Sequence, residues 1–188
     1  DLEDPVLVSL LRLASTEPQA FADLIDDPSR RQTLKVRTNE ALRSFFLQAW
    51  NQAELTVEIN LEDSVLKVFV TDLTGDVNSV KITDRSDGLR MFVCLAAFLA
   101  KAASSGPPPI LLIDEADLHL HLNAQADLVR LLQDAEQVSQ VIYTTHSPGC
   151  LPTDLGSGVR FVQPDKDGKE KSLIRHDFWT LQDSSAVG

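Results

Sequence analysis

The chain has 188 residues and is acidic: 17 lysine and arginine residues stand against 28 aspartate and glutamate residues, a formal net charge of −11. Apolar residues make up 43% and charged residues 24%, which excludes collagen-like, low-complexity and disordered classes. The longest apolar stretch, residues 91–100, is too short to span a bilayer. Cys94 and Cys150 suggest no disulfide framework, so we expect a cytoplasmic protein without a membrane segment.

The first part of the chain predicts a helical lobe that leads into a small antiparallel sheet. Residues 5–52 carry apolar side chains at helical spacing, with a break at Asp27-Pro28 and a second start from Arg30 to Trp50. Apolar and polar residues then alternate, which predicts three short strands, at residues 55–61, 64–71 and 80–83.

The remainder predicts an α/β arrangement with a partly parallel sheet. A helix opens at Ser86 and runs through Lys101, and a second helix has Asn123 as its expected N-cap. Two short apolar runs, residues 110–113 and 141–144, are typical of buried parallel strands. Residues 158–163 and 172–175, joined by a polar turn, predict a closing hairpin.

The strongest chemical signal is the run Ile110-Leu111-Leu112-Ile113-Asp114-Glu115. Four apolar residues predict a strand, and two carboxylates follow at its carboxyl end, where open α/β sheets place their ligands. Asp114 in that position can hold Mg²⁺ through water, and Glu115 can orient or deprotonate an attacking water. The alternative is a strand that ends in a solvated acidic turn.

Two further segments have the residue types of a phosphate site. Thr144-Thr145-His146-Ser147 follows the second apolar run, so His146 is a candidate for contact with a terminal phosphate or the attacking water. Arg85-Ser86-Asp87-Gly88-Leu89-Arg90 opens a helix with a hydroxyl, free backbone N–H groups and a glycine, which together form an anion site. Taken alone, His146 is better explained as the cap of a turn, and Ser86 as an N-cap.

Together, these segments resemble the C-terminal half of an ABC-type ATPase head of the SMC/RecF group, which includes the OLD-family ATPases. In this resemblance RSDGLR is the signature, ILLIDE the Walker B strand, ADLHLHLNAQ the D-loop and TTHSP the switch-histidine loop. The resemblance covers residues 55 to about 175, and it departs from the best-known signature at Asp87, which replaces a glycine.

The resemblance implies an ABC-head fold, ATP and Mg²⁺ as cofactors, and a role for each motif residue. Asp114 would hold the metal, and Glu115 and His146 would act in catalysis. Ser86, Gly88 and Arg90 would bind the nucleotide of a second head. We therefore expect residues 1–52 to be a helical lobe left from an inserted arm, residues 53–176 the C-terminal part of the head, and residues 177–188 a tail. The resemblance also implies a head-to-head homodimer that acts in DNA transactions or phage defence, with DNA or a nuclease as an expected effector.

A phosphate-binding loop of the form G-x-x-x-x-G-K-[ST] occurs nowhere in the 188 residues. The single Gly-Lys pair, Gly168-Lys169, is followed by glutamate, and Gln163 stands where the first glycine is required. We therefore expect the chain to be a piece of something longer. A separate P-loop segment would complete the site, and the isolated chain would hydrolyse ATP poorly. A non-catalytic interaction module that keeps the ATPase fold is the alternative.

Three other interpretations have weaker support. Asp114-Glu115-Ala116-Asp117 spells the D-E-A-D of helicases, but a helicase has no use for RSDGLR, and the P-loop is again absent. His119 and His121, beside the same acidic residues, form a candidate metal cluster, although incidental loop histidines are the simpler account. Basic residues of the helical lobe form a candidate DNA-facing stripe, but a solvated helix face explains them better: Arg30, Arg31, Lys35, Arg37 and Arg43.

Overall fold

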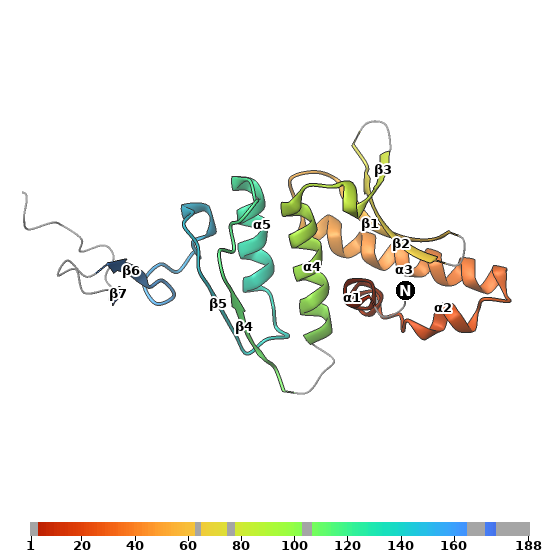
Figure 1. Cartoon of the computed structure of the whole chain (residues 1–188), viewed down its shortest axis with the longest axis horizontal. Helices are drawn as coiled ribbons and strands as arrows, with labels where there is room; N and C mark the ends of the chain where they lie inside the picture. The colour runs from red at the N-terminus through yellow and green to blue at the C-terminus, as the bar shows by residue number, and fades with distance from the viewer. Residues whose placement is uncertain (1–3, 63–64, 75–77, 103–106, 165–171, 176–188) are drawn as a thin grey trace, which may run out of the picture. The chain divides into compact units, whose positions relative to one another are not determined.

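The computed structural model describes residues 4–62, 65–74, 78–102, 107–164 and 172–175 (Figure 1). The chain divides into two compact units, residues 1–150 and residues 151–188. The first unit contains every residue that the sequence proposes for the site. The expected tail, residues 177–188, and the polar turn at 165–171 lie outside the described residues.

The predicted helical lobe is confirmed, and side-chain caps explain where its helices begin. Helix α1 spans Pro5–Leu13, and the Asp4 carboxylate accepts hydrogen bonds from the N–H groups of Val6 and Leu7, each at 2.9 Å. Helix α2 is a short turn, Gln19–Asp23. Helix α3 spans Pro28–Ala49, with Pro28 in its first turn and the Asp27 carboxylate accepting from the N–H of Arg30. The Asp27-Pro28 pair therefore both ends one segment and starts the next.

The antiparallel sheet is also confirmed, with one shift. Strands β1 (Leu55–Glu62), β2 (Val65–Asp72) and β3 (Asn78–Lys81) pair in the order β1-β2-β3. The third strand lies two residues before the expected range of 80–83, and it ends at Lys81 because residues Ile82–Asp84 form the 3-10 turn η1. Asn39 of α3 closes the outer edge of β1: its Oδ1 accepts from the N–H of Ile59 at 2.8 Å, and its Nδ2 donates to the Ile59 carbonyl at 3.1 Å.

The second half of the first unit alternates helix and strand as expected. Its elements are α4 (Asp87–Ala102), β4 (Ile110–Ile113), α5 (Leu122–Gln133) and β5 (Gln140–Tyr143). Strands β4 and β5 pair in parallel, with Ile110 opposite Gln140 and Ile113 opposite Tyr143. The expected N-cap Asn123 is wrong by two residues: His121 occupies the cap position without a side-chain cap bond, because the helix already includes Leu122.

The two parallel strands are not buried on both faces, which corrects the expectation from their apolar runs. Leu111 is 8% exposed and belongs to the core, whereas Ile110 is 58%, Leu112 71% and Ile142 50% exposed. Within the described residues each strand has one hydrogen-bonded neighbour, and the face that carries Ile110, Leu112 and Ile142 stays exposed. An apolar run predicts a strand built for burial, but it does not say which part of the protein covers it.

A single core joins the helices of the first unit to both of its sheets. Figure 1 shows α1 beside α4, and Trp50, just after α3, meets Phe92 of α4 edge to face with ring centroids 4.7 Å apart. The largest fully buried side chains of this core come from α1, α3, α4, α5 and the antiparallel strands: Phe46, Phe92, Leu10, Leu11, Leu42, Ile59, Leu128, Val57, Val70 and Val93.

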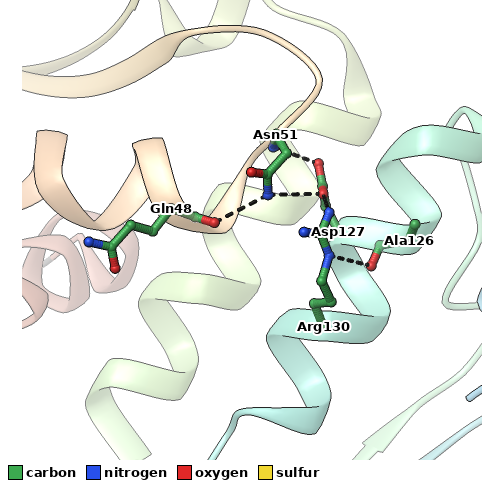
Figure 2. Close-up of polar contacts among 5 residues, drawn as sticks. All are labelled: Gln48, Asn51, Ala126, Asp127 and Arg130. Atoms are coloured by element: carbon green, nitrogen blue, oxygen red, sulfur yellow. Dashed lines mark hydrogen bonds and ion pairs between the residues drawn. The ribbon is translucent and has the colours of Figure 1, made fainter. Parts of the chain in front are cut away.

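A buried carboxylate fastens α5 to the end of α3 (Figure 2). Asp127 is 1% exposed and accepts from the backbone N–H of Asn51 at 2.8 Å and from its side-chain amide at 3.3 Å. Its remaining charge is met by an ion pair with Arg130 on the same helix. Because a buried carboxylate is stable only when it is paired and hydrogen-bonded, these contacts fix how the two helices meet.

The second unit contains the predicted hairpin. Strands β6 (Phe161–Pro164) and β7 (Ser172–Arg175) pair antiparallel, and β6 begins three residues later than the expected start at Gly158. Over the part of the chain that is described, no helix is both long and apolar enough to cross a membrane. Cys94 and Cys150 are free thiols.

Candidate functional site

The candidate site lies where β4 and β5 end, because parallel strands deliver their following residues to the same edge. Asp114 and Thr144 are the first residues beyond the paired Ile113 and Tyr143. The Thr144 hydroxyl donates to Asp114 Oδ1 at 2.5 Å, and its oxygen accepts from the N–H of Glu115 at 2.8 Å. Thr144 therefore orients the first carboxylate and holds the backbone of the second.

Glu115 has a backbone conformation that non-glycine residues rarely adopt. Its φ is +50°, in the left-handed region, and His119 four residues later has φ +63°. Such a conformation costs an L-residue about 1–2 kcal/mol and is found preferentially at functional sites. The side chains of Asp114 and Glu115 are both exposed, so the turn presents two adjacent carboxylates to solvent.

Asp117 links this turn to the loop that follows β5. Its Oδ1 accepts from the Thr145 hydroxyl at 2.5 Å and from the backbone N–H of His146 at 3.2 Å. The hydrogen bond from Thr145 is the main reason that the pKa of Asp117 lies below its ordinary value, and partial burial opposes it. His146 itself is exposed.

A buried amide makes the third link between the two loops. Gln125 of α5 is 7% exposed; its Nε2 donates to the Leu120 carbonyl at 3.0 Å, and its Oε1 accepts from the Ser147 hydroxyl at 2.6 Å. Gly149 lies so close that a Cβ there would be 2.4 Å from Gln125 Oε1. The loop after β5 is thus seated on the start of α5.

The predicted signature segment forms the start of α4, with Ser86 as its cap. The Ser86 hydroxyl accepts from the N–H of Leu89 at 3.5 Å, a weak cap bond. Asp87 turns to an ion pair with Arg90, and this hydrogen bond with its positive charge lowers the pKa of Asp87. The charge of the Asp87 carboxylate is thereby compensated on its own helix.

Gly88 brings the start of α4 against the loop that follows β4. A Cβ at Gly88 would be 2.3 Å from the His119 carbonyl oxygen and 3.1 Å from Leu120 Cδ2, so no larger residue fits. His119, with its left-handed φ, and Gly88 thus form one close backbone contact. This contact was not predicted, because nothing in the sequence pairs these two positions.

The sequence-predicted residues occupy two connected places. Asp114, Glu115 and His146 follow adjacent strand ends, and Ser86, Gly88 and Arg90 form the start of α4, joined to the first group through the Gly88–His119 contact. Sequence reasoning missed Thr144, Thr145 and Gln125 as organisers of the site. The available signal was the pairing of acids after one strand with hydroxyls after the other.

Two alternative interpretations find no support in the geometry. Among the described residues, no group of three or more histidine, cysteine, aspartate or glutamate side chains is arranged to hold a metal ion, so His119 and His121 make no such cluster. Of the candidate DNA-facing stripe, Arg31 donates to the Ile25 carbonyl and Lys35 to Asn60 Oδ1, so these two cations serve the lobe itself.

Comparison with known proteins decides the family. A family model described as "AAA domain, putative AbiEii toxin, Type IV TA system" matches residues 10–151, well over half of the chain. The chain belongs to this AAA-domain family. The match includes residues 85–90, both parallel strands and the loops that follow them.

Curated relatives of this AAA-domain chain are considerably longer than it is. The "Retron Ec83 probable ATPase" of Escherichia coli is 28% identical over 184 residues, which cover 87% of this chain and 34% of that protein. The "Septu protein PtuA" of Bacillus mycoides (strain KBAB4) is 29% identical over 123 residues, covering 60% of this chain and 17% of the relative. The chain therefore spans about a third of the retron relative's length.

Solved structures similar to the AAA-domain chain are SMC ATPase heads. One, from work on "ATP-driven dimerization and DNA stimulated activation of SMC ATPases", has a TM-score of 0.52 and 20% identity and covers 76% of this chain and 87% of its own. Another, an Smc head domain of Pyrococcus furiosus bound to the C-terminal domain of ScpA, has a TM-score of 0.51 and 13% identity, over 91% of this chain and 50% of that one. These likenesses confirm the predicted ABC-head type of α/β fold.

Proposed function

We propose that the chain is the signature, Walker B, D-loop and switch-histidine half of an ATP-hydrolysing head. The observation that supports this most strongly is the joined pair of loops after β4 and β5. It sets Asp114 and Glu115 beside the loop of His146 through the Thr144 bonds. In this proposal Asp114 holds Mg²⁺, Glu115 takes a proton from the attacking water, and His146 contacts the terminal phosphate.

The described residues fit one side of a Mg–ATP site. Asp114 offers an exposed carboxylate oxygen, the ligand type that Mg²⁺ prefers, and Glu115 is an exposed neighbour free to face a water. Bound Mg–ATP supplies the terminal phosphoryl group and the charge that the metal neutralises. The chain's own contribution is to present two adjacent exposed carboxylates at the strand end, with the Glu115 backbone in the left-handed region and bonded to Thr144.

The cradle for the other phosphates is absent from the sequence, and we propose that a P-loop segment of a longer protein supplies it. The exposed apolar face of β4 and β5, with Leu112 71% and Ile110 58% exposed, is the surface on which we expect that segment to pack. The relatives, of which this chain covers 34% and 17%, are long enough to contain one. The cytoplasmic location we propose agrees with two free thiols.

For the head as a whole we propose an ATP-dependent homodimer in which Ser86, Gly88 and Arg90 bind nucleotide held by the other head. Its proposed setting is DNA transactions or phage defence, with DNA or a nuclease as effector. Support comes from the similarity to a retron probable ATPase and a Septu protein, and from one structural neighbour whose description names DNA-stimulated activation of SMC ATPases.

The carboxylate pair is tested in the full-length protein. Asp114→Asn should weaken Mg²⁺-dependent nucleotide binding. Glu115→Gln should leave binding intact and lower turnover by roughly 10²–10⁴-fold, with a nucleotide-bound dimer accumulating on size exclusion. Glu136→Gln, an exposed glutamate after α5, is the matched control and should behave as wild type. Wild-type turnover by Glu115→Gln would contradict the assigned role, and a full-length protein without ATPase activity would favour the interaction module.

The need for completion is tested by calorimetry with the 188-residue chain. Without a phosphate cradle it should bind Mg–ATP no more tightly than about millimolar, roughly −4 kcal/mol. In the full-length protein, Leu112→Glu should abolish nucleotide binding, because a charge would be buried under the P-loop segment. Micromolar binding by the chain alone, or full binding by the Leu112→Glu protein, would contradict the split-head proposal.

A further inference from the structure

The loop that carries His146 is held by side chains rather than by continuous strand pairing. Strand β5 ends at Tyr143, and Thr144 makes the last backbone bonds to the neighbouring segment, its N–H donating to the Ile113 carbonyl at 2.9 Å. Thr144 donates to Asp114, Thr145 donates to Asp117, and Ser147 donates to Gln125. Each hydroxyl of this loop thus has an acceptor on the segment that follows β4.

Among these links, the one at Asp117 restrains His146 directly. One oxygen of the carboxylate accepts both the Thr145 hydroxyl and the backbone N–H of His146. Thr145 Oγ in turn accepts from the N–H of Ser147 at 3.0 Å. The N–H of His146 is therefore anchored to the carboxylate directly and that of Ser147 through the Thr145 hydroxyl. The two bonds that reach the carboxylate have a charged acceptor and are stronger than neutral ones.

The turn that presents Asp117 is itself fixed at both ends. The N–H of Ala116 donates to the Thr144 carbonyl at 2.9 Å, and the N–H of Leu120 donates to the Asp117 carbonyl at 3.0 Å. Ala116 and Leu120, which flank Asp117 in this turn, are buried in the core. Asp117 is therefore aimed by a packed turn and has little freedom to follow the loop it holds.

We propose that Asp117 is a positioning residue: it sets the place of the His146 imidazole relative to the Glu115 carboxylate, and it touches neither nucleotide nor metal. This inference rests on the proposed function, since it needs His146 to act on the terminal phosphate. A displacement of about 1 Å at a reacting group can cost up to roughly 10²-fold in rate, so a loosened His146 loop has a measurable effect.

The kinetic test uses the full-length protein and separates kcat from KM. Asp117→Leu and Thr145→Val should each lower kcat for ATP hydrolysis roughly 10–100-fold with KM unchanged, because binding contacts are preserved. Asp117→Asn keeps an acceptor oxygen, and Thr145→Ser keeps the hydroxyl, so both should retain most of kcat. Asp26→Leu, at an exposed aspartate before α3, is the matched control.

A double variant tells positioning from a direct role. In a His146→Ala background, Asp117→Leu should lower kcat no further, because its effect passes through the imidazole that is already absent. An additional loss there, or a raised KM in the single variant, would overturn the inference, since Asp117 would then contact the nucleotide or act by another route.

A structural readout makes this result independent of the proposed function. In the 188-residue chain, backbone amide exchange at His146 should speed up at least about tenfold in Asp117→Leu and remain near wild type in Asp117→Asn. Unchanged exchange in Asp117→Leu overturns the inference whatever the kinetics. A full-length wild type that hydrolyses no ATP overturns the proposed function instead, and exchange then decides alone whether Asp117 holds the His146 backbone.

Discussion

The antiparallel sheet β1–β3 and the parallel pair β4–β5 belong to the same compact unit, yet their apolar side chains are buried to different degrees. In the first, Val57, Ile59 and Val70 are fully buried, and Asn39 closes the edge at Ile59. In the second, Ile110, Leu112 and Ile142 remain half exposed or more. The difference shows that the parallel pair has apolar side chains of the kind found in a protein interior, although none of the described residues covers them.

The largest expected effect separates the two sheets by burial. Ile59→Ala should lower the free energy of unfolding of the chain by about 2–5 kcal/mol, because it leaves a cavity in a closed core. Leu112→Ala, on the open face, should cost less than about 0.5 kcal/mol. Urea unfolding of both variants measures this contrast. Equal losses would mean that Leu112 is covered in the isolated chain, and the comparison between the sheets would fail.

The second expected effect concerns the support of the site loop. Gly88→Ala places a Cβ against the backbone carbonyl of His119 and should destabilise the chain by about 1–3 kcal/mol. Gly156→Ala is the control, because the nearest atom to its Cβ is a side-chain oxygen at 3.5 Å. Thermal melts of the two variants compare them. A neutral Gly88→Ala would show that α4 and the loop after β4 are not in close contact.

The third prediction concerns the two hydrogen bonds from the Asn39 side chain to the edge of β1. Asn39→Leu leaves both the N–H and the carbonyl of Ile59 without their partner and should cost about 1–3 kcal/mol. Asn39→Asp keeps the acceptor for the N–H and should lie between that variant and wild type. Chemical unfolding gives the order. If Asn39→Leu is as stable as wild type, the edge of β1 is no better closed than that of β4.

The smallest expected effect is a pH dependence at the site loop. The pKa of Asp117 is lowered by the Thr145 hydrogen bond, so its charged form is favoured in the folded state. Its contribution to stability is fully present above the unfolded pKa, near 3.8, and is lost as the pH falls through the lower folded pKa. The difference in urea midpoint between wild type and Asp117→Asn should therefore shrink below about pH 4. A difference that is constant across this range would mean that the bond does not depend on the charge of Asp117.

Much of the fold could be predicted because the sequence patterns are local. Alternating residues at 55–61 predict a half-buried strand, and two equal apolar runs followed by polar residues predict two parallel strands with a shared edge. That edge is enough to bring the residues that follow the two strands together, as the bond between Thr144 and Asp114 shows. The exposure of Leu112 could not be predicted, because an apolar strand gives no sign of where its covering layer lies.

The links between the loops could not be predicted, for a different physical reason. Whether Thr145 meets Asp117 depends on a turn whose left-handed residues are Glu115 and His119, and neither is a glycine or an asparagine that would signal such a backbone. Likewise, the close contact of Gly88 with His119 depends on packing between two segments that are 31 residues apart in the sequence. Such contacts follow from the three-dimensional arrangement and leave no pattern in the chain.

Tyr143, the last residue of β5, gives the chain an optical probe of its site. It is the single tyrosine among the 188 residues, and its hydroxyl donates to the Cys150 carbonyl at 2.6 Å, across the loop that carries His146. Burial raises the pKa of this phenol. Spectrophotometric titration with alkali therefore reads one group without any substitution or label. A nucleotide or a partner segment that moves the His146 loop would change the pH at which that absorbance appears.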